Sequence, residues 1–157
     1  MPHSIKVGIV GVNQYIERML QEIADRNIIP ESNIFVYDKT SDIAHRFSTR
    51  NFILCDDVFS VILKSEIIFI TVKKNAFGST LVPIRSMTGR KVLVSTVEGV
   101  DCRYLTDRVV NGTYGVYVRT RETQNGNTVI SIEYSNGFPS YLKEVITDIF
   151  SAMGTIE

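Results

Sequence analysis

The stretch of sequence that decides the fold is Lys6-Val-Gly-Ile-Val-Gly-Val-Asn-Gln-Tyr-Ile-Glu-Arg-Met-Leu20. Residues 7–10 form a short apolar run that is typical of a buried strand, and Gly8 and Gly11 punctuate it. Beyond the second glycine, apolar side chains recur at helical spacing, at Ile16, Met19, Leu20 and Ile23. The stretch therefore predicts a strand that passes through a tight glycine turn into a helix, which is how a βαβ unit begins.

The turn between this strand and helix has the spacing, but not the residues, of the Gly-x-Gly-x-x-Gly fingerprint with which many βαβ units bind a dinucleotide. The three glycine positions hold Gly11, Asn13 and Ile16. We expect the Asn13 side chain to stand where backbone should approach the pyrophosphate, and the β-branched Ile16 to push the helix away from the strand. The two changes together predict weak or lost dinucleotide binding.

Downstream of this unit, β-type and α-type segments continue to alternate. We expect strands at residues 33–37, 52–54, 66–72, 91–95 and 113–119. We expect helices at residues 41–48, 56–63, 75–86 and 101–108. The alternation predicts one doubly wound, mostly parallel α/β sheet with helices on both faces, a three-layer αβα arrangement. The segments around Val7, Ile34, Ile68 and Val92 should be adjacent or nearly adjacent parallel strands.

Single residues refine two of these helices. Asn75 is expected to cap the helix at 75–86, which should end or kink near Pro83, because proline cannot continue the helical hydrogen-bond ladder. Asp101 is expected to cap the helix at 101–108.

The last forty residues have a different pattern. The runs 113–119 and 127–134 are β-rich, and Asn125-Gly126 in the connection predicts a hairpin, which we place at the edge of the sheet. Residues 140–153 follow as a helix with one apolar face, and Gly154 ends it. The final residues, 155–157, have the pattern of a strand that is cut short.

The composition is that of an ordinary globular protein, with 44% hydrophobic and 22% charged residues, and the length favours one domain over residues 1–157. Seventeen basic residues balance seventeen acidic ones, which argues against nucleic acid as a partner. No apolar run approaches the ~20 residues of a membrane helix, and the first residues lack a signal-peptide pattern, so we expect a cytoplasmic protein that binds no membrane. Cys55 and Cys102 have no metal or redox spacing, and no metal site is expected.

Five segments resemble, in order, the N-terminal NAD(P)-binding domain of pyrroline-5-carboxylate reductase. They are Val-Gly-Ile-Val-Gly (7–11), Ile-Ile-Pro-Glu-Ser-Asn-Ile-Phe-Val-Tyr-Asp (28–38), Ile-Ile-Phe-Ile-Thr-Val-Lys (67–73), Val-Leu-Val-Ser-Thr-Val-Glu-Gly-Val (92–100) and Asp-Ile-Phe-Ser-Ala-Met-Gly (148–154). Related domains of the F420-dependent NADP oxidoreductase type share most of them. The resemblance implies a Rossmann-like fold and an NAD(P)H-using reductase of proline biosynthesis. It places the pyrophosphate over the first glycine turn and the nicotinamide between the segments that follow the fourth and fifth strands.

The resemblance also implies which residues would meet NADP or NAD. They are Gly8, Gly11, Val12, Asn13, Gln14, Asp38, Lys39, Thr40, Ser41, Val72, Lys73 and Glu98. Asp38 is in the place of an acid that binds a ribose 2′-hydroxyl, whereas Lys39 and Ser41 beside it would suit a 2′-phosphate. The alternative for this segment is a solvated turn in which Asp38 caps the next helix.

The chain departs from the family at several of its motifs. The family's Ala-Val-Lys-Pro motif is Thr71-Val72-Lys73-Lys74 here, and Glu98 replaces the alanine of an Ala-Gly pair. The family's Met-Pro-Asn-Thr-Pro segment aligns with residues 118–123, which contain no proline. The helical domain that builds the family's dimer and substrate site has no counterpart before Glu157, and no catalytic residue is assigned to this chain.

Three hypotheses follow for the function. The first is a divergent, catalytically incomplete relative of the reductase that binds a small ligand or a partner. The second is an active NAD(P)H-dependent reductase domain whose helical domain is absent from this chain, and the third is an interaction module without a ligand. We also expect a homodimer through the hairpin at 113–134 and the helix face around Phe138, Tyr141 and Phe150, because an exposed sheet edge invites strand pairing.

Overall fold

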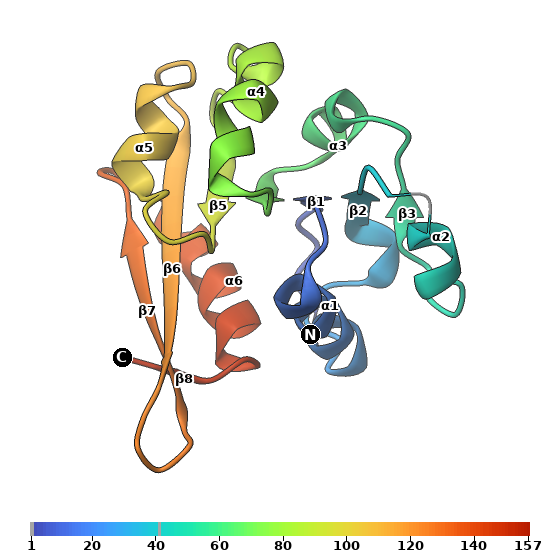
Figure 1. Cartoon of the computed structure of the whole chain (residues 1–157), viewed down its shortest axis with the longest axis vertical. Helices are drawn as coiled ribbons and strands as arrows, with labels where there is room; N and C mark the ends of the chain where they lie inside the picture. Colours follow the sequence, from blue (N-terminus) through green and yellow to red (C-terminus); the bar gives the residue numbers. More distant parts are fainter. Residues whose placement is uncertain (1, 41) are drawn as a thin grey trace.

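The computed structural model describes residues 2–40 and 42–157, which fold around one eight-stranded sheet with the order β3-β2-β1-β4-β5-β6-β7-β8 (Figure 1). The strands are β1 (Val7–Val10), β2 (Ile34–Tyr37), β3 (Ile53–Leu54), β4 (Ile67–Ile70), β5 (Val92–Ser95), β6 (Tyr114–Glu122), β7 (Thr128–Tyr134) and β8 (Thr155–Ile156). Neighbouring strands are parallel except β6 and β7, which are antiparallel. The predicted Rossmann-like, doubly wound fold with an antiparallel hairpin is confirmed.

Helices cover both faces of this sheet. They are α1 (Gln14–Asp25), α2 (Ile43–Arg46), α3 (Val58–Lys64), α4 (Phe77–Leu81), α5 (Cys102–Asp107) and α6 (Ser140–Ser151). Short 3-10 turns are η1 (Glu31–Asn33), η2 (Lys74–Ala76) and η3 (Val82–Ile84). Figure 1 shows α3, α4 and α5 along one side of the sheet and α1 and α6 on the other. Each face has its own hydrophobic core, so the arrangement is the predicted three-layer one.

The alternation of side chains along β1 shows how the two cores form. Val7 and Ile9 point into the core beneath α1 and α6, whereas Val10 points into the core beneath α3 and α4. Ile16 of α1 is fully buried in the first of these cores. The Ile16 side chain fills space in the core between α1 and the sheet, and the expected displacement of the helix stays a prediction.

Capping residues set where several helices begin. Asn13 caps α1 and Asp101 caps α5, each through a side-chain oxygen that accepts a backbone N–H three residues later. The predicted helix at 75–86 is instead three short pieces, η2, α4 and η3, and Pro83 lies in the last of them. Asn75 does not cap α4, since it lies inside η2 and Ala76 occupies the cap position.

The C-terminal part differs from the expectation in two ways. The hairpin forms the edge of the sheet only in part, because the two-residue strand β8 pairs in parallel with β7 at Val129 and Ile130. The side chains of Phe138 and Phe150 are buried in the core, so of the three residues expected on an exposed helix face only Tyr141 is exposed. The prediction of a short final strand is confirmed.

Candidate functional site

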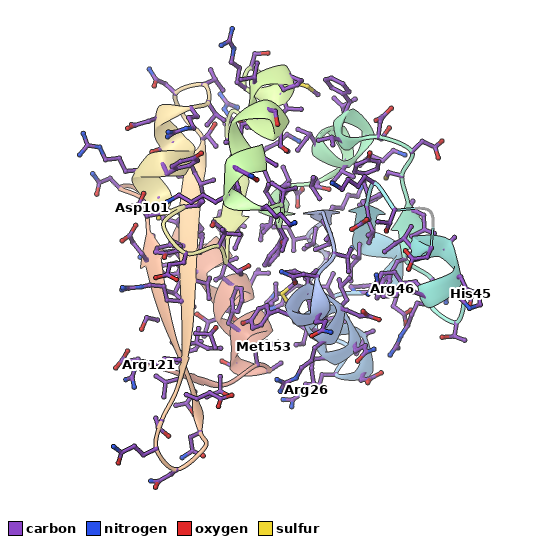
Figure 2. All side chains as sticks on the ribbon, in the orientation of Figure 1. Arg26, His45, Arg46, Asp101, Arg121 and Met153 are labelled. Carbon is purple, nitrogen blue, oxygen red and sulfur yellow. The ribbon has the colours of Figure 1, made fainter. Side chains whose placement is uncertain are left out.

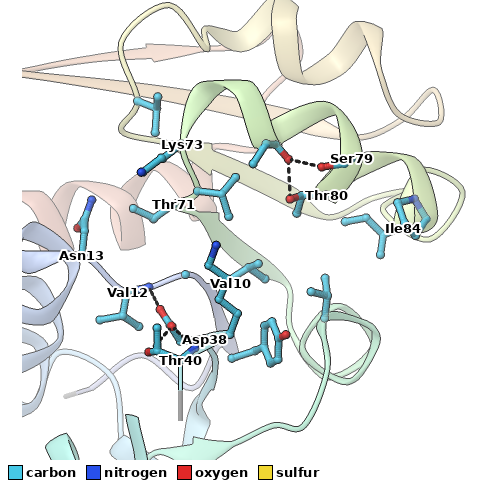
Figure 3. A pocket seen from close by; sticks show the side chains of 18 of the residues that line it. Val10, Val12, Asn13, Asp38, Thr40, Thr71, Lys73, Ser79, Thr80 and Ile84 are labelled. Carbon is cyan, nitrogen blue, oxygen red and sulfur yellow. Dashed lines mark hydrogen bonds between the residues drawn. The ribbon is translucent and has the colours of Figure 1, made fainter. Parts of the chain in front are cut away.

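A cavity of about 1030 Å³ lies at the carboxyl ends of β1, β2 and β4 (Figure 3). The chain runs from β1 outward to β2 and β3 and then returns to β4 on the other side of β1, so the strand order reverses there. Ligands of doubly wound sheets bind at such a switch point. The described residues that line the cavity are Val10, Gly11, Val12, Asn13, Tyr37, Asp38, Lys39, Thr40, Asp42, Arg46, Val58, Phe59, Thr71, Val72, Lys73, Asn75, Ala76, Ser79, Thr80, Pro83, Ile84 and Val97.

The floor of the cavity is the turn at Gly11. This residue has a φ of +89°, and a Cβ added to it would lie 2.4 Å from the carbonyl oxygen of Thr71. Both facts require glycine, because other residues rarely adopt this φ and the added atom would collide with rigid backbone. The Gly11 N–H donates to the Tyr37 carbonyl oxygen at 2.8 Å, so the turn is held between the ends of β2 and β4.

The carboxylate of Asp38 holds together the polar side of the cavity. Its Oδ2 accepts the Val12 N–H at 2.7 Å, and its Oδ1 accepts the Thr40 N–H at 2.8 Å and the Thr40 hydroxyl at 2.7 Å. Burial opposes ionisation, but these hydrogen bonds, with the Arg46 charge, outweigh it and hold the pKa of Asp38 below its ordinary value. Asp38 is thus ionised and oriented. It does not cap the next helix, since Asp42 precedes α2.

The Asn13 side chain caps helix α1, in addition to standing where the pyrophosphate was expected to approach the backbone. Its Oδ1 accepts the Ile16 N–H at 2.9 Å. Within the described residues, the backbone N–H groups of Asn13, Gln14 and Tyr15 make no hydrogen bond, as is usual for the first turn of a helix. The turn therefore still offers donors to an anion, but the amides of Val12 and Ile16 already have protein acceptors.

Basic and apolar groups complete the cavity. Lys39 and Lys73 are exposed at its rim. Arg46 of α2 lines it as well and forms an ion pair with Glu17 of α1, at the α2 side of the molecule in Figure 2. Sequence reasoning missed Arg46, because a short helix without a motif does not reveal which side chain turns toward the sheet. Apolar side chains cover the opposite wall, among them Val58, Val72, Pro83 and Ile84.

Eight of the predicted site residues thus meet at this one cavity, and three of the other described ones, Gly8, Gln14 and Glu98, do not line it. The eight are Gly11, Val12, Asn13, Asp38, Lys39, Thr40, Val72 and Lys73. Gln14 is exposed on α1 and does not line the cavity. Ser41 lies outside the described residues. Gly8 lies inside β1, where an added Cβ would be 2.5 Å from Ser65 Oγ and 2.6 Å from Val61 Cγ1, so its role is close packing against α3.

Glu98, the last predicted residue, lines a second cavity of about 750 Å³. This cavity lies between the segment after β5 and the outer part of the hairpin, and its lining residues are Thr96, Glu98, Gly99, Tyr117, Val118, Arg119, Thr120, Arg121, Ser131 and Glu157. Arg121 forms an ion pair with Glu157 at 2.8 Å, and the Ser131 hydroxyl donates to the same carboxylate at 2.7 Å. These two contacts lower the pKa of Glu157. Arg121 is therefore already paired.

A doubly wound sheet with a cavity at its switch point is the architecture of dinucleotide-binding α/β domains. Solved structures share the fold of this chain. The chain superimposes on pyrroline carboxylate reductase of Plasmodium falciparum with NADP bound, with a TM-score of 0.83 and 24% identity over 100% of this chain and 58% of that one. It also matches a pyrroline-5-carboxylate reductase from Coxiella burnetii, with a TM-score of 0.86 and 11% identity over 98% of this chain and 58% of that one.

An imine reductase from Aspergillus terreus, in complex with NADPH4 and dibenz[c,e]azepine, matches with a TM-score of 0.77 and 15% identity over 98% of this chain and 54% of that one. These similarities show the fold, and they confirm the predicted resemblance to pyrroline-5-carboxylate reductases at that level. The chain spans somewhat more than half the length of each of these proteins. No protein-family model and no curated protein sequence matches the chain.

Two further observations concern other kinds of site. Among residues 2–40 and 42–157, no cluster of three or more histidine, cysteine, aspartate or glutamate side chains is placed to hold a metal ion. In the same part of the chain, every helix is too short or too polar to cross a bilayer.

Proposed function

We propose that this chain is a nucleotide-binding domain of the pyrroline-5-carboxylate reductase type, a divergent relative that binds its ligand in the cavity at the ends of β1, β2 and β4 and performs no reduction by itself. The observation that carries the proposal is the anchored, ionised carboxylate of Asp38 beside the Gly11 turn. That pair of features is what a ribose and its phosphate meet in a doubly wound fold.

Asp38 supports a ligand whose ribose carries a free 2′-hydroxyl. Its Oδ2 accepts one hydrogen bond, from Val12, and a carboxylate oxygen has the capacity to accept a second from a sugar hydroxyl. A 2′-phosphate at the same place would bring two negative charges together. We therefore expect NAD to bind better than NADP, although solved structures of similar fold contain NADP or NADPH.

The changed glycine turn supports weak binding of either dinucleotide. Asn13 adds a side chain where the second glycine of the fingerprint permits close approach, and it also occupies the amide of Ile16. We expect dissociation constants in the millimolar range or above, which corresponds to at most about 4 kcal/mol of binding free energy.

Titration of the isotope-labelled chain with NAD and with NADP, followed by amide chemical shifts, tests this proposal. The backbone amides of Gly11, Val12 and Asp38 should shift, more strongly with NAD. Asp38→Asn should weaken NAD binding about tenfold and bring its affinity close to that of NADP. The reason is that the negative charge that favours a ribose 2′-hydroxyl over a 2′-phosphate is lost. Asp56→Asn is the matched control, since Asp56 is exposed and does not line the cavity.

Two outcomes would contradict the proposal. If neither dinucleotide shifts the amides of the cavity, the chain is better described as an interaction module without this ligand. A micromolar dissociation constant would instead favour the second hypothesis, an active NAD(P)H-dependent reductase domain.

A further inference from the structure

We propose that the cavity takes a mononucleotide, that is, one nucleoside with its phosphates and a free ribose diol, rather than a dinucleotide. This inference rests on the proposed function, because it specifies the ligand class of the same cavity. It departs from the family resemblance, which implies a cofactor that extends from the glycine turn to the segments after β4 and β5.

The first reason is that the two halves of such a cofactor would lie in separate cavities. The first cavity holds the glycine turn and Asp38, and the second holds Thr96, Glu98 and Gly99 after β5. Among the described residues, the two cavities share no lining residue. A dinucleotide would have to extend from one cavity to the other, past the segments that separate their lining residues.

Val97 forms one part of this division. It lines the first cavity, whereas Thr96, Glu98 and Gly99 on either side of it line the second. Its backbone is fixed, because the Val97 N–H donates to the buried Ser95 hydroxyl at 3.1 Å. Val97 therefore lies at the boundary between the lining residues of the two cavities.

Lys74 forms the other part. Lys73 and Asn75 line the first cavity, and the Lys74 side chain between them reaches the loop after β5, where its Nζ lies 2.6 Å from the position of an added Cβ on Gly99, a residue that lines the second cavity. Gly99 has a φ of +84°, and its N–H donates to the Tyr117 hydroxyl at 3.2 Å. Lys74 thus contacts, from the segment after β4 beside the first cavity, the loop after β5 that lines the second.

The second cavity is also poorly suited to a flat ring. Its charged groups include Arg121 and Glu157, which are paired with each other. Its larger apolar side chains, Tyr117 and Val118, are only 7% and 2% exposed. Little apolar surface remains there to cover a nicotinamide.

The first cavity, in contrast, provides for each part of a mononucleotide. Asp38 is placed for the ribose diol, and Val72, Pro83 and Ile84 form an apolar wall for the base. Lys73 and the N–H groups at the start of α1 supply positive charge and donors for phosphate. Figure 3 shows these groups around one space, with Asp38 and Thr40 on one side and Lys73 and Ile84 on the other.

The test compares ADP with NAD on the isotope-labelled chain by amide chemical shifts. We expect the two dissociation constants to agree within about threefold, because the nicotinamide half adds no contact. Both ligands should shift Gly11 and Asp38, and neither should shift Gly99 or Tyr117. Lys74→Ala should tighten NAD binding at least fivefold and leave ADP binding unchanged. Lys143→Ala on α6, which lines neither cavity, should change neither affinity.

The possible results separate the two proposals. NAD that binds ten times tighter than ADP to the unmodified chain, with shifts at Gly99 and Tyr117, overturns the mononucleotide inference and leaves the proposed function standing. An unchanged NAD affinity in Lys74→Ala also counts against it. If neither ADP nor NAD shifts Gly11 or Asp38, the proposed function fails, and this inference fails with it.

Discussion

The two halves of the sheet end in different ways. β1, β2 and β4 are four residues long and stop at Val10, Tyr37 and Ile70, and the next residue of each lines the first cavity. β6 has nine residues and continues to Glu122, paired with β7 through Thr128. A crevice forms where parallel strands stop and their connections diverge, whereas a long hairpin uses its backbone groups for the partner strand. Binding groups therefore gather at the first half.

Each half of the sheet carries an arginine that lines a cavity and forms an ion pair. Figure 2 shows Arg46 beside the first half and Arg121 on the hairpin, on opposite sides of the molecule. Arg46 pairs with Glu17 and still lines the first cavity, whereas Arg121 pairs with Glu157 next to β8. Both arginines thus line a cavity while paired within the protein, and only the Arg121–Glu157 pair also joins the hairpin to the residue after β8.

The largest effect on stability is expected for a change in α6, the helix that packs against β4 at the centre of the sheet. Phe150 of α6 is fully buried against Phe69 of β4, with ring centroids 6.0 Å apart. Phe150→Ala should lower the free energy of unfolding by about 4 kcal/mol, measured by urea denaturation, because it leaves a cavity in the core. Tyr141→Ala is the control, since Tyr141 is 71% exposed and its loss should change stability by less than about 0.5 kcal/mol. Equal effects of the two changes would show that this face is not part of the core.

Substitution of Gly8 tests whether this glycine is needed for packing in the first half of the sheet or for binding a cofactor. Gly8→Ala should cost about 2 kcal/mol of stability, because the new methyl group collides with Ser65 and Val61. Gly78→Ala in α4 is the matched control. Open space surrounds that position, so the change should stabilise the chain by up to about 1 kcal/mol. A stable Gly8→Ala variant with lost nucleotide binding would instead assign Gly8 to the site.

The two halves should lose stability at opposite ends of the pH scale. Burial and then the Glu133 carboxylate raise the pKa of the Cys102 thiol from 9.0 to about 12. The unfolded thiol ionises first as pH rises, so this stabilisation is complete below about pH 9 and is lost between pH 9 and 12, with a slope of at most about 1.4 kcal/mol per pH unit. Denaturation across this range should show a smaller slope for Cys102→Ala than for the parent chain.

The cavity half should respond to acid. The pKa of Asp38 is lowered in the folded chain, so its stabilisation is complete above the unfolded value near 3.8 and is lost as pH falls through the folded value. Asp38→Asn should remove that acid dependence and leave the alkaline one unchanged. Identical acid slopes in the parent chain and the variant would show that Asp38 is not held by its hydrogen bonds.

A smaller effect is expected at the start of α1. Asn13→Ala should cost about 1 kcal/mol, because the Ile16 N–H loses its acceptor. Asn13→Gly should cost only a few tenths of a kcal/mol and should tighten nucleotide binding, since the phosphate can then approach the backbone. Calorimetric titration of both variants with ADP would measure this. Weaker binding in the glycine variant would show that the Asn13 side chain itself contacts the ligand.

The smallest expected effect is on the self-association of the chain. We still expect a dimer through the C-terminal third, although β8 covers Val129 and Ile130 and narrows the available strand edge. Light scattering of the chain at high concentration should give the mass of a dimer, and Val129→Asp should shift it toward the monomer. A monomer at every concentration would sink this prediction, and Ser140→Asp on α6 serves as a charge control away from the strand edge.

Several parts of the molecule could be predicted because their signals are local. The apolar run at 67–70, the turn at Gly11 and the cap at Asp101 depend on a few neighbouring residues, and the structure has each of them. The broken helix around Pro83 was predicted only in part. Proline signals an interruption, but the 3-10 turns on both sides of α4 depend on how the segment packs against β4 and β5.

The amino-acid sequence by itself determined the order of the elements, the doubly wound parallel sheet and the altered glycine turn, because hydrophobic periodicity and turn chemistry are written in adjacent residues. Only the tertiary structure decided that Asp38 turns back to the Val12 amide, that Gly8 packs beneath α3, and that Lys74 crosses to Gly99. Each of these contacts joins segments that lie 25 or more residues apart in the sequence. Such contacts are set by the packing of the whole sheet, and no single stretch of sequence predicts them.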